Sequence, residues 1–261
     1  MNRRKGKILN NLMKSWPNNT VAVYAWLNQK DVYRQLAGQY VKSGWIERIG
    51  PGAFKRSGES IDWWGGLYAL QKQLGMSVHP AGKTALEIHG YGHYLPASLS
   101  QKKVVLFGGG GERLPLWFKK YDWTVDIRYT MTNLFGQDEI RGLTVHDLAG
   151  YDVRISTPER ASLELCYDVP IKESFGELDR IMSGLTTLRP RVVQELLERC
   201  GSVKAKRLFM YLAEKHGHRW FSGLDAGRID LGKGKRVICC NGRYDSKYKI
   251  VVPREPGADE E

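Results

Sequence analysis

Hydrophobic residues recur at helical spacing in the segment that spans residues 20–56. Val23, Trp26 and Leu27 are separated by three and four positions, which places them on one face of a helix. The polar residues 28–31 interrupt this pattern, and the short side chain of Asp31 suits the N-cap of a second helix. The pattern therefore predicts two helices joined by a tight turn.

The second predicted helix has an apolar face and a polar face. The apolar face carries Val32, Leu36 and Tyr40, with Ala37 and Val41 beside them. The polar face carries Arg34, Gln35, Gly38, Gln39 and Lys42. Arginine pairs with guanine, glutamine pairs with adenine and lysine reaches phosphate, so this face suits a groove of DNA.

A short β-hairpin follows this helix. Ser-Gly at residues 43 and 44 ends the helix, and residues 45–49 and 53–56 have the composition of two strands. The glycines of the intervening Gly-Pro-Gly allow a tight turn, and the hairpin carries Arg48, Lys55 and Arg56. These elements predict a winged helix-turn-helix, a DNA-binding module. The alternative is a solvated amphipathic helix before an ordinary hairpin.

The placement of charge favours DNA binding. The net charge is +12 over 261 residues, with +9 in residues 1–56, −2 in residues 57–201, +8 in residues 202–255 and −3 in the last three residues. Positive charge concentrated in the predicted module suits phosphate binding. A predicted first helix, residues 3–16, contributes Arg3, Arg4, Lys5 and Lys7, which either contact the DNA backbone or form a solvated end.

Polar turn-forming residues at positions 57–60 predict a domain boundary. We therefore expect an α+β protein, with a winged helix-turn-helix in residues 1–58 and a mixed α/β domain in residues 59–261.

In the second domain, helices are predicted at residues 62–74, 82–89, 115–121, from 157 onward, 175–183, 191–200 and 203–216. Strands are predicted at residues 104–107, 124–130, 151–155, 228–231, 236–239 and 248–252, and Asn241-Gly242 predicts a hairpin turn.

Four cysteines and the lack of a long apolar run indicate the compartment. Cys166, Cys200, Cys239 and Cys240 form no C-x-x-C pair and fit reduced thiols better than a disulfide framework. No apolar run approaches the roughly 18 residues of a membrane span, and no apolar segment of a signal peptide is present. We expect a cytoplasmic protein with no membrane partner.

Candidate catalytic and metal-binding residues are sparse. His89 and His93 have i, i+4 spacing and His79 lies nearby, but neighbouring glycines oppose a regular helix, so packing roles are favoured over a metal site. The glycine run at residues 108–111 lacks the lysine of a P-loop and fits a flexible connection better. The carboxylates a nuclease would require are scattered: Asp122, Asp126, Asp152 and Glu159. We expect no enzyme activity, no metal and no cofactor.

Four segments of the sequence resemble one known family. They are YVKSGWIERIGPGAF, DWWGGLYALQKQLGMSVHPAGKTALEIHGYGHYLP, STPERASLELC and LTTLRPRVVQELLERCGSVKAKRLFMYLAEKHGHRWFSGLDAGRIDLGKGKRV. In this order they are similar to AbiEi-type antitoxins of type IV toxin–antitoxin systems, which are linked to abortive phage infection. The resemblance covers nearly the whole chain.

The resemblance implies a function for each domain. The N-terminal domain would bind inverted repeats in double-stranded promoter DNA and repress its own operon, through Arg34, Gln35, Gln39 and Lys42 of the helix and Arg48, Lys55 and Arg56 of the wing. The C-terminal domain would counter a nucleotidyltransferase-like toxin, which need not form a stable complex. The chain would be a monomer in solution or a cooperative pair on DNA. The alternatives are a plain regulator with a ligand-sensing C-terminal domain and a DNA-targeted nuclease.

A second group of basic residues lies near the C-terminus. Its members fall on one helical turn and on a nearby glycine-rich turn: Lys204, Lys206, Arg207, Lys233, Lys235 and Arg236. They are predicted to clamp the DNA backbone or to face the toxin or its nucleic-acid substrate. The alternative is a solvated face.

Overall fold

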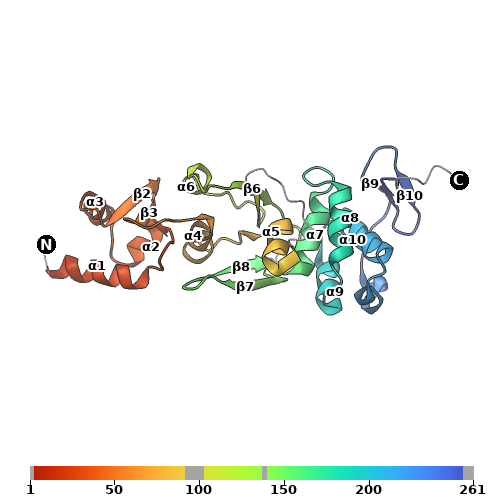
Figure 1. Ribbon diagram of the computed structural model, residues 1–261, viewed down its shortest axis with the longest axis horizontal. Helices are drawn as coiled ribbons and strands as arrows, with labels where there is room; N and C mark the ends of the chain where they lie inside the picture. Colours follow the sequence, from red (N-terminus) through yellow and green to blue (C-terminus); the bar gives the residue numbers. More distant parts are fainter. Residues whose placement is uncertain (1–2, 92–102, 137–139, 255–261) are drawn as a thin grey trace. The chain divides into compact units, whose positions relative to one another are not determined.

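The computed structural model describes residues 3–91, 103–136 and 140–254 (Figure 1). The chain divides into two compact units. The first unit comprises residues 1–79, 99–132 and 145–155, and the second comprises residues 80–98, 133–144 and 156–261. The winged helix-turn-helix lies within the first unit, and the domain boundary after residue 58 stays a prediction.

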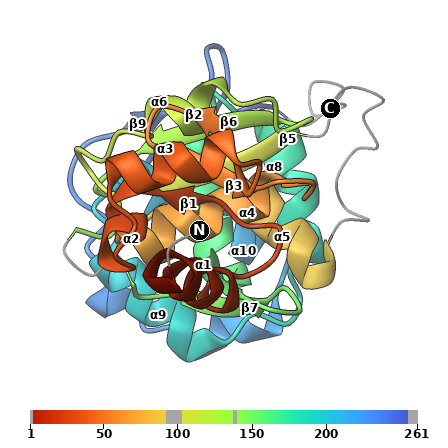
Figure 2. The ribbon, with the colours of Figure 1, turned by 90° about the vertical axis from the view of Figure 1, so that its left-hand side faces the viewer.

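Residues 3–56 form the predicted winged helix-turn-helix (Figure 2). The elements follow in the order α1 (Arg3–Ser15), β1 (Ala22–Val23), α2 (Tyr24–Gln29), α3 (Arg34–Lys42), β2 (Ile46–Gly50) and β3 (Ala53–Arg56). The strands form an antiparallel sheet in the order β1-β3-β2. The sequence prediction of the fold is confirmed for this module.

A separate hydrophobic core holds the three helices and the sheet of this module together. Trp16, Leu27, Leu36, Ile46 and Phe54 are buried in it. The Trp16 indole N–H donates to the Thr20 carbonyl at 3.1 Å, and its ring meets the Trp26 ring edge-on at 5.9 Å between centroids. The residues of the apolar face of α3 supply much of this core, so the opposite face of α3 remains in solvent.

Two details of the predicted helices were wrong. Val23 is the last residue of β1, because it pairs with Ala53 of β3, so α2 begins one residue later. Asp31 is not an N-cap. It has a φ of +60° inside the turn, and the residue before α3 is Tyr33. In that turn the Val32 N–H bonds to the Leu27 carbonyl at 2.9 Å, which is what closes the chain tightly between α2 and α3.

The rest of the first unit combines a helical segment with two small sheets. Asp62 caps α4 (Trp63–Tyr68), which continues into a π-helical turn (Ala69–Gln73). β5 (Lys103–Gly108) and β6 (Asp126–Met131) run parallel on either side of α6 (Leu116–Lys120) in the sequence, and β4 (His79–Pro80) completes their sheet in the order β4-β5-β6. β7 (Leu143–Asp147), which was not predicted, pairs with β8 (Asp152–Ser156).

The glycine run after β5 forms a hydrogen-bonded turn in the first unit. The Gly109 N–H donates to the Ser77 hydroxyl at 2.8 Å. The Glu112 carboxylate accepts both from that hydroxyl and from the Ser77 N–H, each at 2.9 Å. Side-chain hydrogen bonds therefore hold the segment in place.

The second unit is mainly helical (Figure 1). Its helices are α5 (Gly82–Leu86) with a π-helical turn (Glu87–Tyr91), α7 (Pro158–Asp168), α8 (Phe175–Gly184), α9 (Pro190–Arg199) and α10 (Val203–Lys215). The last four pack around a shared hydrophobic core. A small sheet in the order β10-β11-β9 follows, built from β9 (Arg236–Val237), β10 (Arg243–Asp245) and β11 (Ile250–Val252).

Two predictions for the C-terminal segment were wrong. The strand expected at residues 228–231 is absent from the described structure, where a 3₁₀ turn (Ala226–Arg228) lies instead. Asn241-Gly242 does not join neighbouring antiparallel strands, because β9 runs parallel to β11 and β10 pairs with β11. Asn241 has a φ of +58°, and a Cβ on Gly242 would lie 2.2 Å from the Val252 carbonyl oxygen. The pair therefore forms a turn that packs beneath β11.

Candidate nucleic-acid interface

The polar face of α3 is exposed along its length. Arg34, Gln35, Gln39 and Lys42 are exposed to solvent, whereas Leu36, Ala37 and Tyr40 between them are buried. Nothing lies within 4 Å of the position that a Cβ on Gly38 would occupy. The middle of this face is therefore flat enough for another backbone to approach closely.

A groove of about 490 Å³ lies between α3 and the wing. It is lined by Tyr24, Arg34, Ala37, Arg48, Pro51, Gly52 and Phe54. The Arg34 guanidinium lies 6.0 Å from the centroid of the Tyr24 ring, and that of Arg48 lies 5.7 Å from the Phe54 ring. The lining contains two cations and no carboxylate. Stacking limits the rotamers of both arginines and leaves their N–H groups available to an anion.

The sequence pattern did not identify Tyr24 and Phe54 as part of this groove. The Tyr24 N–H bonds to the Gly52 carbonyl at 2.7 Å, and Phe54 pairs with Ala22 across the sheet. These contacts bring the start of α2 beside the wing. No local sequence pattern predicts these two contacts, because the residues that form each one are about 30 positions apart in the chain.

Lys5 extends the basic surface toward the C-terminal half of α3. Its ammonium donates to the Gln39 side chain at 3.1 Å, and the Tyr40 hydroxyl donates to the Lys5 carbonyl at 3.2 Å. Burial, followed by the nearby Tyr33, raises the pKa of the Tyr40 hydroxyl above its ordinary value, so it stays protonated as a donor. The first turn of α1 is thereby fixed beside the exposed face.

The other two cations of the wing have intramolecular partners. Lys55 pairs with Glu47 at 3.1 Å, and this hydrogen bond is the main cause of the lowered pKa of the Glu47 carboxyl. Arg56 lies over the Trp16 ring and donates to the Asn18 side chain and to the Met13 carbonyl, both at 2.7 Å. Both cations are half-buried. That they contact DNA stays a prediction.

The second basic group does not form one surface patch. Lys206 and Arg207 are buried. Arg207 donates to the carbonyls of Leu231, Gly232, Gly234 and Lys249. The ammonium of Lys204 is bound to the carbonyls of Tyr167 and Val169 at the end of α7, and burial lowers its pKa. The predicted patch is wrong for α10 because Lys204 and Arg207 donate to carbonyl groups within the fold and Lys206 is buried.

The cations of the glycine-rich turn at residues 232–236 are more accessible than those of α10. Lys233 and Lys235 are exposed, and Arg236 is half-buried with hydrogen bonds to the carbonyls of both lysines. A role for this turn in binding nucleic acid or toxin stays a prediction.

Among the residues considered for catalysis, two histidines and two carboxylates have structural partners. His79 bonds to the Ser77 carbonyl at 2.7 Å and His89 to the Ser156 carbonyl at 2.9 Å, while His93 lies outside the described residues. Asp152 pairs with Lys72 at 2.6 Å, and Glu159 pairs with Arg189 at 2.9 Å. No group of three metal-ligating side chains occurs in the part of the chain that is described.

No helix among the described residues is both long enough and apolar enough to span a membrane.

Two family models match consecutive parts of the chain. The model described as "Transcriptional regulator, AbiEi antitoxin N-terminal domain" matches residues 5–97, and the model described as "Transcriptional regulator, AbiEi antitoxin, Type IV TA system" matches residues 101–253. No curated protein matches the chain.

A solved structure supports the fold. The chain is similar to the structure titled "Crystal structure of RV2827C protein from Mycobacterium tuberculosis", with 14% sequence identity, a TM-score of 0.55, and coverage of 94% of this chain and 90% of that chain. The likeness shows a shared fold. The family matches extend over nearly the whole sequence, and the chain therefore belongs to the AbiEi antitoxins of type IV toxin–antitoxin systems, a family of transcriptional regulators.

Proposed function

We propose that this antitoxin represses its own operon by binding inverted repeats in promoter DNA, and that it counteracts a nucleotidyltransferase-like toxin without catalysing a reaction itself. In this proposal the α3 face enters the major groove through Arg34, Gln35, Gln39 and Lys42. The wing, with Arg48, Lys55 and Arg56, follows the adjacent backbone. The chain acts in the cytoplasm as a monomer that pairs on the operator.

The groove between α3 and the wing carries the DNA-binding half of the proposal. Two arginines from different elements line it, each stacked on an aromatic ring, and no carboxylate shares the lining. The Arg48 guanidinium on the wing would hold a backbone phosphate at the groove, while the Arg34 guanidinium on α3 would face a base edge, and both donors are already oriented. The α3 residues then lie beside the base edges, where arginine and glutamine distinguish sequence.

Arg34→Ala and Gln39→Ala are expected to weaken specific binding to the chain's own upstream DNA. A bidentate base contact contributes about 1–3 kcal/mol, so each substitution should raise the Kd by roughly 5- to 150-fold. The measurement is a fluorescence-anisotropy titration of the upstream duplex and of a scrambled duplex at two salt concentrations. Arg191→Ala is the matched control, because its side chain is 92% exposed on α9 in the second unit.

The same titration examines the wing. Each phosphate contact contributes about 0.9 to the slope of log K against log salt. Arg48→Ala should therefore lower the slope by about one, and Lys55→Ala and Arg56→Ala test whether these two cations also contact phosphate. Equal affinities for both duplexes, unchanged by Arg34→Ala, would contradict sequence-specific repression. Two protein chains per duplex at saturation would support pairing on inverted repeats.

Antitoxin action requires a separate experiment in cells. Co-expression of the chain with the nucleotidyltransferase-like protein encoded beside it should restore growth that the toxin alone arrests. The Arg34→Ala/Arg48→Ala double variant should still restore growth when transcribed from an unrelated promoter, because the second unit is unchanged. Failure of the unaltered chain to restore growth would contradict this half of the proposal, whatever the DNA titration shows.

A further inference from the structure

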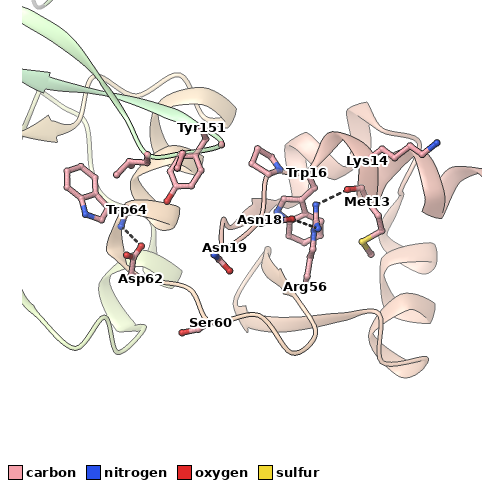
Figure 3. A pocket seen from close by; sticks show the side chains of 14 residues that line it. Met13, Lys14, Trp16, Asn18, Asn19, Arg56, Ser60, Asp62, Trp64 and Tyr151 are labelled. Carbon is pink, nitrogen blue, oxygen red and sulfur yellow. Dashed lines mark hydrogen bonds between the residues drawn. The ribbon is translucent and has the colours of Figure 1, made fainter.

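A second cavity, of about 760 Å³, lies within the first unit behind the winged helix-turn-helix (Figure 3). It opens between the end of α1 with the loop that follows, the segment before α4, and the turn between β7 and β8. The lining residues are Met13, Lys14, Trp16, Pro17, Asn18, Asn19, Arg56, Ser60, Asp62, Trp64, Leu148, Ala149, Gly150 and Tyr151. Its volume lies in the range of about 300–1,000 Å³ that small-molecule sites occupy. We refer to it as the α1 cleft.

Hydrogen-bonding groups without partners converge on the α1 cleft. Asp62 uses one carboxylate oxygen to accept from the N–H groups of Trp64 and Gly65, at 3.0 and 3.2 Å, and its other oxygen has no partner among the described residues. The same holds for the Asn19 carboxamide and the Tyr151 hydroxyl. Figure 3 shows these three side chains directed toward a common space.

The Tyr151 hydroxyl is a hydrogen-bond donor at neutral pH. Burial, followed by the negative charge of Asp62, raises the pKa of Tyr151 to about 12. The Tyr151 phenol therefore keeps its proton and offers a donor, beside the second oxygen of Asp62 and a carboxamide that both donates and accepts.

The aromatic wall of the α1 cleft is rigid. The Trp64 ring is stacked on Trp63 at 3.9 Å and on His146 at 5.4 Å between centroids. These two ring contacts limit the rotation of the indole. A ligand would meet a fixed wall here and would gain little by stacking on it.

Cationic residues lie across the α1 cleft from Asp62. Arg56 on this side is paired with Glu59 at 3.4 Å and donates to Asn18 and to the Met13 carbonyl, so its charge is neutralised within the fold. Figure 3 shows Lys14 beyond it, with its side chain extending away from Asp62. Lys14 is exposed and has no acidic partner among the described residues. The α1 cleft thus has a hydrogen-bonding wall formed by Asp62, Asn19 and Tyr151, and the exposed ammonium of Lys14 at its rim.

We propose that the α1 cleft binds a nucleoside phosphate of adenine or cytosine, the bases that carry an amino group where guanine and uracil carry a carbonyl (C6 of the purine, C4 of the pyrimidine). Asparagine pairs bidentately with adenine, and a carboxylate accepts from an exocyclic amino group. Uracil has a carbonyl at the corresponding position and would place an acceptor against the acceptor of Asp62. The phosphate would lie toward Lys14, whose ammonium has no acidic partner among the described residues. This inference is independent of promoter recognition.

The test is isothermal titration calorimetry of the full chain with AMP, CMP, UMP and inorganic phosphate. AMP or CMP is expected to bind at least about tenfold more tightly than UMP, since one bidentate base contact discriminates by about that factor or more. Inorganic phosphate alone is expected to bind more weakly than either. Equal affinities for AMP, CMP and UMP, or no heat of binding at millimolar nucleotide to a folded chain, would overturn the proposal.

Two substitutions locate the site. Asp62→Asn keeps an oxygen for the cap of α4 and replaces the free acceptor with a donor, so the preference should move toward UMP by about tenfold. Tyr151→Phe removes only the hydroxyl and should weaken AMP or CMP binding. Asp122→Asn is the matched control, because Asp122 also accepts from a nearby backbone N–H, that of Thr124, and does not line the α1 cleft. Unchanged binding in both variants would overturn the assignment.

Discussion

Arg207→Ala is expected to lower the free energy of unfolding by about 4 kcal/mol, because a hydrogen bond from a charged donor contributes about 1.5–3 kcal/mol and water replaces only part of the four that are lost. Arg207 is 1% exposed and donates to four backbone carbonyls between residues 231 and 249. The effect should appear in urea denaturation followed by circular dichroism. The loss arises from the C-terminal segment, which wraps around this guanidinium.

Arg207→Lys separates charge from geometry. Lysine keeps the positive charge but cannot reach carbonyls on several sides at once, so most of the stability loss should remain. Arg191→Ala serves as the control on an exposed arginine of the same unit. If Arg207→Ala left stability unchanged and reduced DNA affinity, the residue would act at the surface, as the sequence pattern predicts.

Trp16→Ala is expected to destabilise the winged helix-turn-helix by about 3–5 kcal/mol, the usual cost of truncating a buried tryptophan. The Trp16 ring is 1% exposed, donates to Thr20, meets Trp26 edge-on and lies under Arg56. Its removal takes away packing on which α1, α2 and β3 all depend. The readouts are denaturation by urea and the temperature at which specific DNA binding is lost.

Trp45 supplies a control of the same residue type in the same module. Its side chain is 48% exposed at the start of the hairpin, so Trp45→Ala should change stability by only about 0.5 kcal/mol. Similar losses in the two variants would show that Trp16 is not the centre of this core.

The winged helix-turn-helix could be predicted because its information is local. The apolar residues of α3 repeat at helical spacing, and the Gly-Pro-Gly of the wing lies between two strand-like segments. The two wrong details lie where one element ends and the next begins. Val23 has the spacing of the helix that follows, and only its pairing with Ala53 makes it a strand residue. Asp31 has the composition of an N-cap, but the turn requires a positive φ at that position.

The basic residues of α10 show the limit of reading charge from sequence. Lys204 and Arg207 are close together on one helix, which suggests a charged surface. Their environment depends on carbonyls at residues 167–169 and 231–249. Spacing along a helix gives the direction of a side chain, but not what the rest of the chain places over it.

The two candidate sites also differ in how far they could be predicted from local sequence. The polar face of α3 could be predicted, because all its residues lie within nine positions of one another. The α1 cleft could not be predicted, since Asn19, Asp62 and Tyr151 come from three separate segments. None of the three belongs to a recognisable motif, and only the packing of the β7–β8 turn within the first unit brings them together.

Helix α1 is hydrogen-bonded at both of its ends. Near its start, Lys5 bonds to Gln39 and Tyr40 of α3, and near its end the Met13 carbonyl accepts from Arg56 at the α1 cleft. A helix transmits a small axial displacement without bending, so the two ends move together. If a bound nucleotide shifts α1 and thereby changes the affinity for DNA by some factor, thermodynamic linkage requires DNA to change the affinity for that nucleotide by the same factor. Promoter occupancy would then report the nucleotide content of the cell.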